Sequence, residues 1–237
     1  MNKVDVVIPT RGHVNKYLLK VLKSVDWVAN IYITRERPLS VARKNAVLKA
    51  STEWVAMFDD DVIVPPYWYY EVSKYIRRDV GAIATVARQC DKDFDTYERI
   101  IDIVYGLHRV DTSPHINNVL IRRELMKSYD PPNLFLGEDQ FLRKHVEACN
   151  FKWLVLKHIG VVHLGAVKSK IDVGIAYKRY AHYSIYQLIR RAFSRFLLAP
   201  FAAFANLSGR TLLRLYVDNV HFISGWMKEY FNQAWWL

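Results

Sequence analysis

The sequence has few cysteines and few glycines for its length, with 2 Cys and 9 Gly among 237 residues. Cys90 and Cys149 lie far apart and form neither a CxxC pair nor a zinc quartet, so a zinc-binding module is excluded. A structural disulfide between them stays open, but nothing else in the sequence supports it. We find no internal repeat and no low-complexity segment, which argues against repeat proteins and disordered tracts.

Acidic residues are the scarcer charge. The chain carries 34 Lys and Arg against 23 Asp and Glu, a formal net charge of +11. The imbalance is strongest from residue 168 onward, where ten Lys and Arg stand against three acids, a net charge of +7. A basic tail is typical of proteins whose partner is anionic: nucleic acid, phospholipid or a phosphorylated substrate. Composition alone does not choose among the three.

Long apolar runs are also missing. The uncharged stretch FLLAPFAAFANL (196–207) contains a proline and is shorter than the ~20 residues of a straight membrane span. No leader-like segment precedes the first apolar run, VDVVIP, so we expect the body of the protein in the cytoplasm. With 51% hydrophobic and 24% charged residues the composition is globular, and the length allows one sizeable core with an appendage.

The first half of the chain alternates between two kinds of pattern. Short apolar runs at 4–9, 30–34 and 54–58 predict strands. The stretches between them, 14–25 and 38–50, have the spacing of helices. Strand, helix, strand, helix, strand is the pattern of a parallel α/β sheet, in which ligands collect at the carboxyl ends of the strands.

Further elements follow downstream, although residues 91–113 show no readable pattern. We expect a helix in WYYEVSKYIRR, a strand at 81–88, a strand that turns into a helix in INNVLIRRELM, a helix at 137–148, and two short strands in FKWLVL and IGVVHLG.

The tail from residue 168 mixes aromatic residues with cations. Its apolar residues recur at helical spacing, which is typical of amphipathic helices that lie at a membrane interface. A helical subdomain packed on the sheet or on a second subunit is the alternative. We therefore expect an α/β domain over 1–167 and a basic, aromatic-rich amphipathic helical region over 168–237.

Three consecutive carboxylates, Asp59, Asp60 and Asp61, follow the apolar run WVAMF. One Asp after a strand caps a helix, but three adjacent anions exceed that role. In an extended segment Asp59 and Asp61 would point the same way and Asp60 the opposite way. Carboxylate oxygens are the ligands of hard divalent cations, so the run favours Mg²⁺ or Mn²⁺, which in turn would hold phosphate oxygens.

Three motifs in this order are similar to a known family: VVIPTRG near the start, DDD at a strand end and GED at a helix start. Together they resemble family 2 glycosyltransferases of the GT-A fold, over roughly residues 3–165. The resemblance implies a Rossmann-like, mostly parallel sheet flanked by helices. It also implies a nucleotide-sugar donor, a GDP- or UDP-sugar, whose diphosphate is bridged to Asp59 and Asp61 by Mg²⁺ or Mn²⁺.

The same resemblance assigns residues around the donor. His163 in VVHLG resembles a further metal ligand, with His158 as the competing histidine. Glu36 stands where many family members have Asp-Gly-Ser, so it is expected to substitute for their acid. The residues expected to contact the donor are Pro9, Thr10, Arg11, Glu36, Arg43, Asp59 and Asp60.

The Glu-Asp pair of GED supplies the expected catalytic base. In inverting family members the Asp deprotonates the acceptor hydroxyl, which assigns that role to Asp139 with Glu138 as the fallback. Alternatively, both acids only stabilise the helix by lying at the positive end of its dipole. A retaining mechanism also stays open. The expected reaction is inverting transfer of a hexose such as mannose.

The basic tail suggests the acceptor. Cations and aromatic residues suit a lipid-linked acceptor, such as a polyprenyl phosphate of the dolichol type or a diphosphate-linked glycan. Arg179, Arg190 and Arg191 are the expected contacts to its phosphate. The expected location is the cytoplasmic face of the cell membrane, peripheral or monotopic.

Two other classes compete. Nucleotidyl transfer to a sugar phosphate uses a related sheet, but usually with a Gly-rich loop after the first strand, whereas PTRGH has one glycine. A nucleic-acid binder fits the sequence pI of about 9.6, yet three exposed carboxylates in a groove would repel phosphates unless a cation intervened. We therefore expect no nucleic-acid partner.

Overall fold

The structure is a computed structural model, which describes residues 3–90, 116–131, 138–164, 178, 184–205 and 209–234. The chain divides into two compact units. The sheet unit comprises residues 1–90 and 109–165, and the helical unit comprises residues 91–108 and 166–237. Each has its own buried apolar clusters.

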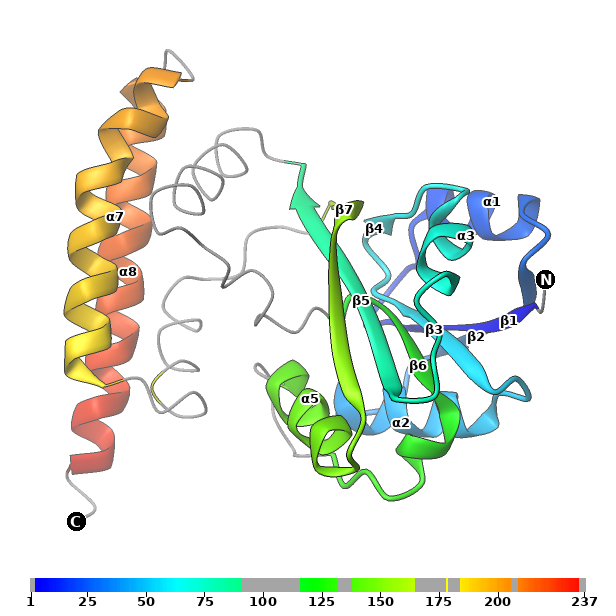
Figure 1. Cartoon of the computed structure of the whole chain (residues 1–237). Coiled ribbons are helices and arrows are strands. Elements are labelled where there is room, and N and C mark those ends of the chain that lie inside the picture. The colour runs from blue at the N-terminus through cyan, green and yellow to red at the C-terminus, as the bar shows by residue number, and fades with distance from the viewer. Residues whose placement is uncertain are drawn as a thin grey trace. The chain divides into compact units, whose positions relative to one another are not determined.

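The sheet unit alternates strands and helices, as the sequence predicts for its first part (Figure 1). Its elements are β1 (Val4–Pro9), α1 (Lys16–Ser24), β2 (Val28–Thr34), α2 (Leu39–Lys49), β3 (Trp54–Phe58), β4 (Val62–Ile63), α3 (Trp68–Ser73), β5 (Val80–Gln89), β6 (Asn118–Arg122), the 3-10 helix η2 (Arg123–Met126), α5 (Glu138–Ala148) and β7 (Lys152–His163).

The strands form one seven-stranded sheet in the order β2-β1-β3-β6-β5-β7-β4. The pairs β1–β2, β1–β3 and β5–β7 are parallel, whereas β6 runs antiparallel to both β3 and β5, and β4 runs antiparallel to β7. The predicted α/β class is therefore confirmed, with a sheet that is mixed rather than mostly parallel. The parallel part is the one that places the ends of β1 and β3 side by side.

Helices cover both faces of this sheet, and the alternation of side chains along the strands explains why. Val6, Ile8 and Phe58 point to the face where α1 and α3 pack. Val7 and Met57, one residue along, point to the face covered by α2, η2 and α5. Both faces are buried, which explains why β3 is apolar throughout and β1 is apolar except for Asp5.

Two predicted elements differ in extent. The helix expected through WYYEVSKYIRR ends at Ser73, because the next amides, of Tyr75 and Ile76, donate to the carbonyls three residues back and so form a turn. The two strands expected in FKWLVL and IGVVHLG are one strand, β7. Its pairing with β5 shifts register between Leu156 and Gly160, which gives the sequence the appearance of a break.

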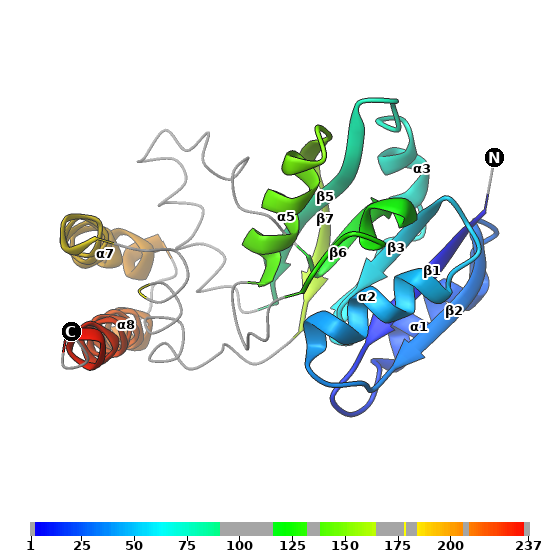
Figure 2. The same cartoon turned by 90° about the horizontal axis from the view of Figure 1, so that it is seen from below.

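The helical unit contains two long helices, α7 (Ile185–Ala205) and α8 (Gly209–Ala234), which lie side by side (Figures 1 and 2). Leu188 and Leu198 of α7 pack against apolar residues of α8 such as Leu215 and Phe222. The predicted C-terminal amphipathic helical region is therefore present. No helix in the described part of the chain combines the length and the hydropathy needed to cross a membrane.

Candidate active site at the carboxyl ends of the strands

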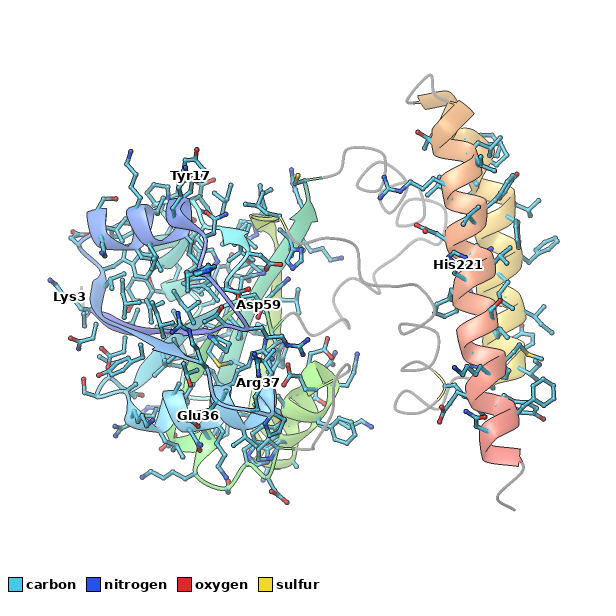
Figure 3. All side chains as sticks on the ribbon, turned by 180° about the vertical axis from the view of Figure 1, so that it is seen from behind. Lys3, Tyr17, Glu36, Arg37, Asp59 and His221 are labelled. Atoms are coloured by element: carbon cyan, nitrogen blue, oxygen red, sulfur yellow. The ribbon has the colours of Figure 1, made fainter. Side chains whose placement is uncertain are left out.

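The parallel pairing of β1 and β3 places two polar segments at the same edge of the sheet. Thr10 follows β1 and Asp59 follows β3, and Figure 3 shows Asp59 well away from Lys3, which precedes β1. At the edge of the sheet formed by β4, this strand pairs with β7 so that Val62 lies opposite His163. The site predicted from strand ends therefore includes the end of β7 as well.

The three aspartates take different partners. The Asp60 carboxylate accepts a short hydrogen bond from the Thr10 hydroxyl, and its carbonyl accepts from the Asn15 amide at 2.8 Å. Residues 60 and 61 form a turn rather than an extended segment. Asp60 therefore fastens the loop after β1 to the end of β3, while Asp59 and Asp61 are left to other partners.

Asp59, Asp61 and His163 form the candidate metal group. Each offers one ligand atom, and these atoms lie within 4.8 Å of one another. His163 Nε2 is 3.3 Å from Asp61 Oδ1, and the other ring nitrogen, Nδ1, has no hydrogen-bond partner in the described part of the chain. Two carboxylates and one imidazole fit Mn²⁺ or Mg²⁺, with the remaining positions open to phosphate or water oxygens.

The electrostatics of Asp61 agree with that fit. Burial raises the pKa of the Asp61 carboxyl above its ordinary value, and the charges of Asp59 and Asp60 raise it further, while His163 acts in the opposite direction. An acid that is costly to ionise beside two other acids is stabilised by a bound cation. The competing histidine, His158, instead lies 3.5 Å from the Tyr75 hydroxyl.

Arg43 of α2 connects this group to α5. Its side chain is only 4% exposed, and Nη2 lies 2.5 Å from Asp59 Oδ1. Nη1 forms an ion pair with Glu138 at the start of α5. The sequence predicted Arg43 near the donor and missed this double pairing. Spacing alone did not reveal it: Arg43 falls three residues from Ser40 and from Ala46, and only the structure shows that this face of α2 is buried.

The predicted catalytic pair lies in the first turn of α5. Asp139 Oδ1 accepts a hydrogen bond from the Gln140 amide at 3.0 Å, while Glu138 is engaged by Arg43. Sequence reasoning missed Tyr129, which is buried at this site. Burial raises the pKa of the Tyr129 hydroxyl, and the charge of Asp139 raises it further. Gly137 lies outside the described residues.

Glu36 has partners on α2. Its carboxylate accepts from Asn45 at 2.6 Å and from Lys49 at 3.1 Å, and the hydrogen bond from Asn45 is the main cause of its lowered pKa. Glu36 and Lys49 line a cavity of about 690 Å³ between β2 and α2. In Figure 3 Glu36 and Arg37 lie on the opposite side of the sheet from Tyr17.

The remaining predicted residues lie in other places. Pro9 ends β1, and Arg11 is exposed in the loop after it. Arg190 is exposed on α7, in the helical unit. Arg179 and the side chain of Arg191 lie outside what the structure describes, and all three acceptor contacts stay predictions.

Comparison with known proteins bears on this arrangement. Residues 28–144 match the family "Glycosyl transferase family 2", a segment that includes Arg43, the three aspartates and the Glu138–Asp139 pair. No protein of curated function matches the chain in sequence.

Solved structures share the fold. A mannosyltransferase from Pyrobaculum calidifontis in complex with GDP-Man and Mn²⁺ is 14% identical, with a TM-score of 0.60 over 97% of this chain and 87% of that one. Glucosyl-3-phosphoglycerate synthase from Mycobacterium tuberculosis, in complex with Mn²⁺ and UDP-glucose, is 14% identical, with a TM-score of 0.52 over 80% of this chain and 79% of that one. The fold is the GT-A fold that the sequence motifs imply.

Proposed function

We propose, from the premise that residues 28–144 form a family 2 glycosyltransferase domain, that this protein transfers a hexose from a GDP- or UDP-sugar to a hydroxyl acceptor. The observation that carries the proposal is the grouping of Asp59, Asp61 and His163 at the strand ends where the aspartate run was expected to bind a cation. The similar structures hold Mn²⁺ with GDP-mannose or UDP-glucose, which supports this donor class.

The cation held by these three residues would neutralise the charge that develops on the leaving nucleotide diphosphate. Thr10 holds Asp60 and so keeps the loop after β1 against the aspartates, where Arg11 and the end of β1 at Pro9 would face the donor. Glu36 completes the donor side of the site in this proposal, and Arg43 contributes to it through its contact with Asp59.

Asp139 is the proposed base. It would take the proton of the acceptor hydroxyl as the hydroxyl oxygen attacks the anomeric carbon from the face opposite the diphosphate, which inverts the configuration. Glu138, the fallback, is ion-paired with the buried Arg43 and is therefore less suited to take a proton. Mannose, as in the similar mannosyltransferase, is the first sugar to test.

A panel of GDP- and UDP-sugars tests the proposal. We expect release of GDP or UDP from one of them in the presence of Mn²⁺, stopped by EDTA and reduced at least a hundredfold in Asp61→Ala. Asp79→Asn, an acid in the turn before β5, is the matched control and should leave release unchanged. Release of pyrophosphate from a nucleoside triphosphate and a sugar phosphate would instead indicate nucleotidyl transfer.

The helical unit suggests a lipid-linked acceptor and a membrane surface. One face of α7 exposes large apolar side chains at steps of three or four residues, which places them in a stripe. They are Tyr186, Ile189, Phe193, Leu197 and Phe201. Such a stripe on a unit with a net charge of +7 from residue 168 onward fits the interface of an anionic bilayer.

In this part of the proposal residues 1–167 are catalytic, and residues 168–237 bind the cytoplasmic face of the cell membrane as a peripheral or monotopic anchor. Arg179, Arg190 and Arg191 would contact the phosphate of a polyprenyl-linked acceptor. Sedimentation with vesicles tests it: we expect binding to vesicles with anionic lipid and its loss in Ile189→Ser/Phe193→Ser. Tyr17→Ser, on α1, is the control, and equal binding of all three proteins would contradict the proposal.

A further inference from the structure

Arg43 is a buried cation that three elements share. It belongs to α2, and its side chain is 4% exposed. Its guanidinium contacts Asp59, which follows β3, and Glu138, which begins α5. Asp59 belongs to the candidate cation group, and Glu138 precedes the candidate base, Asp139.

We propose that Arg43 is a positioning residue that ties the cation group to the start of α5 and so fixes the place of Asp139 relative to the cation. This inference rests on the proposed function, because the distance between Asp139 and the cation matters only if Asp139 is the base for sugar transfer. It differs from a direct role in donor binding, because the guanidinium reaches the site through the two acids that it pairs.

A comparison with Arg122 separates this pairing from ordinary structural ion pairs. Arg122 uses all three nitrogens, with Nε on the Val80 carbonyl, Nη1 on Glu53 and Nη2 on the Arg77 carbonyl, at 2.6 to 3.0 Å. Arg43 Nε and Glu138 Oε2 are buried without a hydrogen-bond partner among the described residues. Arg43 is therefore less completely satisfied than a purely structural arginine, as is typical of functional sites.

The charge of Arg43 has a second consequence. A guanidinium beside Asp59 repels a divalent cation and draws on the negative charge that would bind it. Arg43 thus lowers the affinity of the site for metal while it holds the geometry of transfer. Loss of Arg43 should tighten metal binding while it slows turnover. Simple damage to the fold would instead weaken metal binding and slow turnover together.

Three variants test this: Arg43→Met, Arg43→Lys and the double variant Arg43→Met/Glu138→Gln. The affinity for Mn²⁺ is measured without nucleotide, by electron paramagnetic resonance of free Mn²⁺, and kcat and KM are measured with the donor found by the panel. The double variant neutralises Glu138, the more buried of the two acids that Arg43 pairs, and leaves the charge only on Asp59, whose side chain is 25% exposed. It therefore covers the case in which Arg43→Met alone does not fold.

We expect Arg43→Met to bind Mn²⁺ about three- to tenfold more tightly, and its kcat to fall about a hundredfold, as for a displaced catalytic group. Arg43→Lys keeps the charge and should bind Mn²⁺ like the wild type, with part of kcat recovered. The double variant also lacks the guanidinium beside Asp59, but it has lost the negative charge of Glu138 as well. It should therefore bind Mn²⁺ more tightly than the wild type but less tightly than Arg43→Met, and stay slow.

Weaker Mn²⁺ binding in Arg43→Met would overturn the inference, as would wild-type kcat in the double variant. A raised KM for the donor with unchanged kcat would assign Arg43 to donor binding instead. If the wild type transfers no sugar from any donor while the Mn²⁺ affinities keep the expected order, the proposed function fails and the electrostatic role of Arg43 stands.

Discussion

The two ends of the sheet treat buried acids in opposite ways. At the amino end, Asp5 of β1 is fully buried, and its carboxylate accepts from Asn30, from the Ser51 amide and hydroxyl, and from the Thr52 amide. Burial alone would raise the pKa of Asp5, but these hydrogen bonds together hold it below its ordinary value. At the carboxyl end, the pKa of Asp61 is raised by burial and by two neighbouring acids.

The difference distinguishes an acid that stabilises the fold from one that serves a site. The hydrogen bonds of Asp5 join β1 to β2 and to the segment before β3, so its charge is compensated within the protein. Asp61 has one imidazole and two anions beside it, and its compensation has to come from a ligand. Changes at the amino end should therefore cost stability, and changes at the carboxyl end should cost activity.

The largest expected effect is at the carboxyl end. Asp139→Asn removes the proposed base while keeping the shape of the side chain, so kcat for sugar transfer should fall by about 10² to 10⁴. The free energy of unfolding should change by less than ~0.5 kcal/mol. Steady-state kinetics and urea denaturation measure the two. A large loss of stability in Asp139→Asn would make it resemble Asp5 and would remove the contrast.

Asp5→Ala should show the opposite pattern. The substitution removes the buried acceptor that Asn30, Ser51 and Thr52 share, and with it four hydrogen bonds that tie β1 to its neighbours, which should lower the free energy of unfolding by about 1 to 3 kcal/mol. Urea denaturation at pH 7 measures it. The cation affinity of Asp5→Ala, measured without urea, should equal that of the wild type. A large change in this affinity would mean that the amino end of the sheet also shapes the site.

The smallest expected effect is on the stability of the metal-free protein. Asp61→Asn removes a carboxylate that is unfavourable when ionised, so the variant should be more stable than the wild type at pH 7. Because the Asp61 side chain is 37% exposed, we expect a gain below ~1 kcal/mol.

The stability contributions of Asp61 and Asp5 should depend on pH in opposite directions. The folded pKa of Asp61 is raised, so its favourable contribution is present below the ordinary value of about 4 and is lost as the pH rises through the raised value. The gain in Asp61→Asn should therefore appear as the pH rises from about 4 toward 7. For Asp5, whose pKa is lowered, stability is present above about 4 and is lost as the pH falls through the lowered value. A pH-independent difference for Asp61→Asn would contradict the assignment.

The sequence predicts the parallel part of the sheet well, because the apolar runs of β1 and β3 and the helices between them have clear periodicities. It also predicts that Asp59 and Asp61 end a strand. It does not predict that β6 enters antiparallel between β3 and β5, because strand order depends on tertiary pairing and leaves no local pattern.

The missing parts of the site are of the same kind. The ion pairs of Arg43 join residues 16 and 95 positions apart, and a charged residue in the middle of a helix usually indicates a solvated face. The sequence did not indicate that Tyr129 belongs to the site for a similar reason. Its place near Asp139 depends on how η2 and α5 pack on the sheet. The tail predicted amphipathic helices, but only the packing of α7 on α8 identifies the exposed face.

Calorimetric titration of GDP and UDP into the protein, with and without Mn²⁺, tests whether the strand ends hold a cation that binds the nucleotide. We expect one of the two nucleotides to bind the wild type only when Mn²⁺ is present. Asp61→Asn should lose this binding, and Asp79→Asn should keep it. Nucleotide binding that is independent of Mn²⁺, or that is equal in Asp61→Asn and the wild type, would contradict a cation site at the ends of the strands.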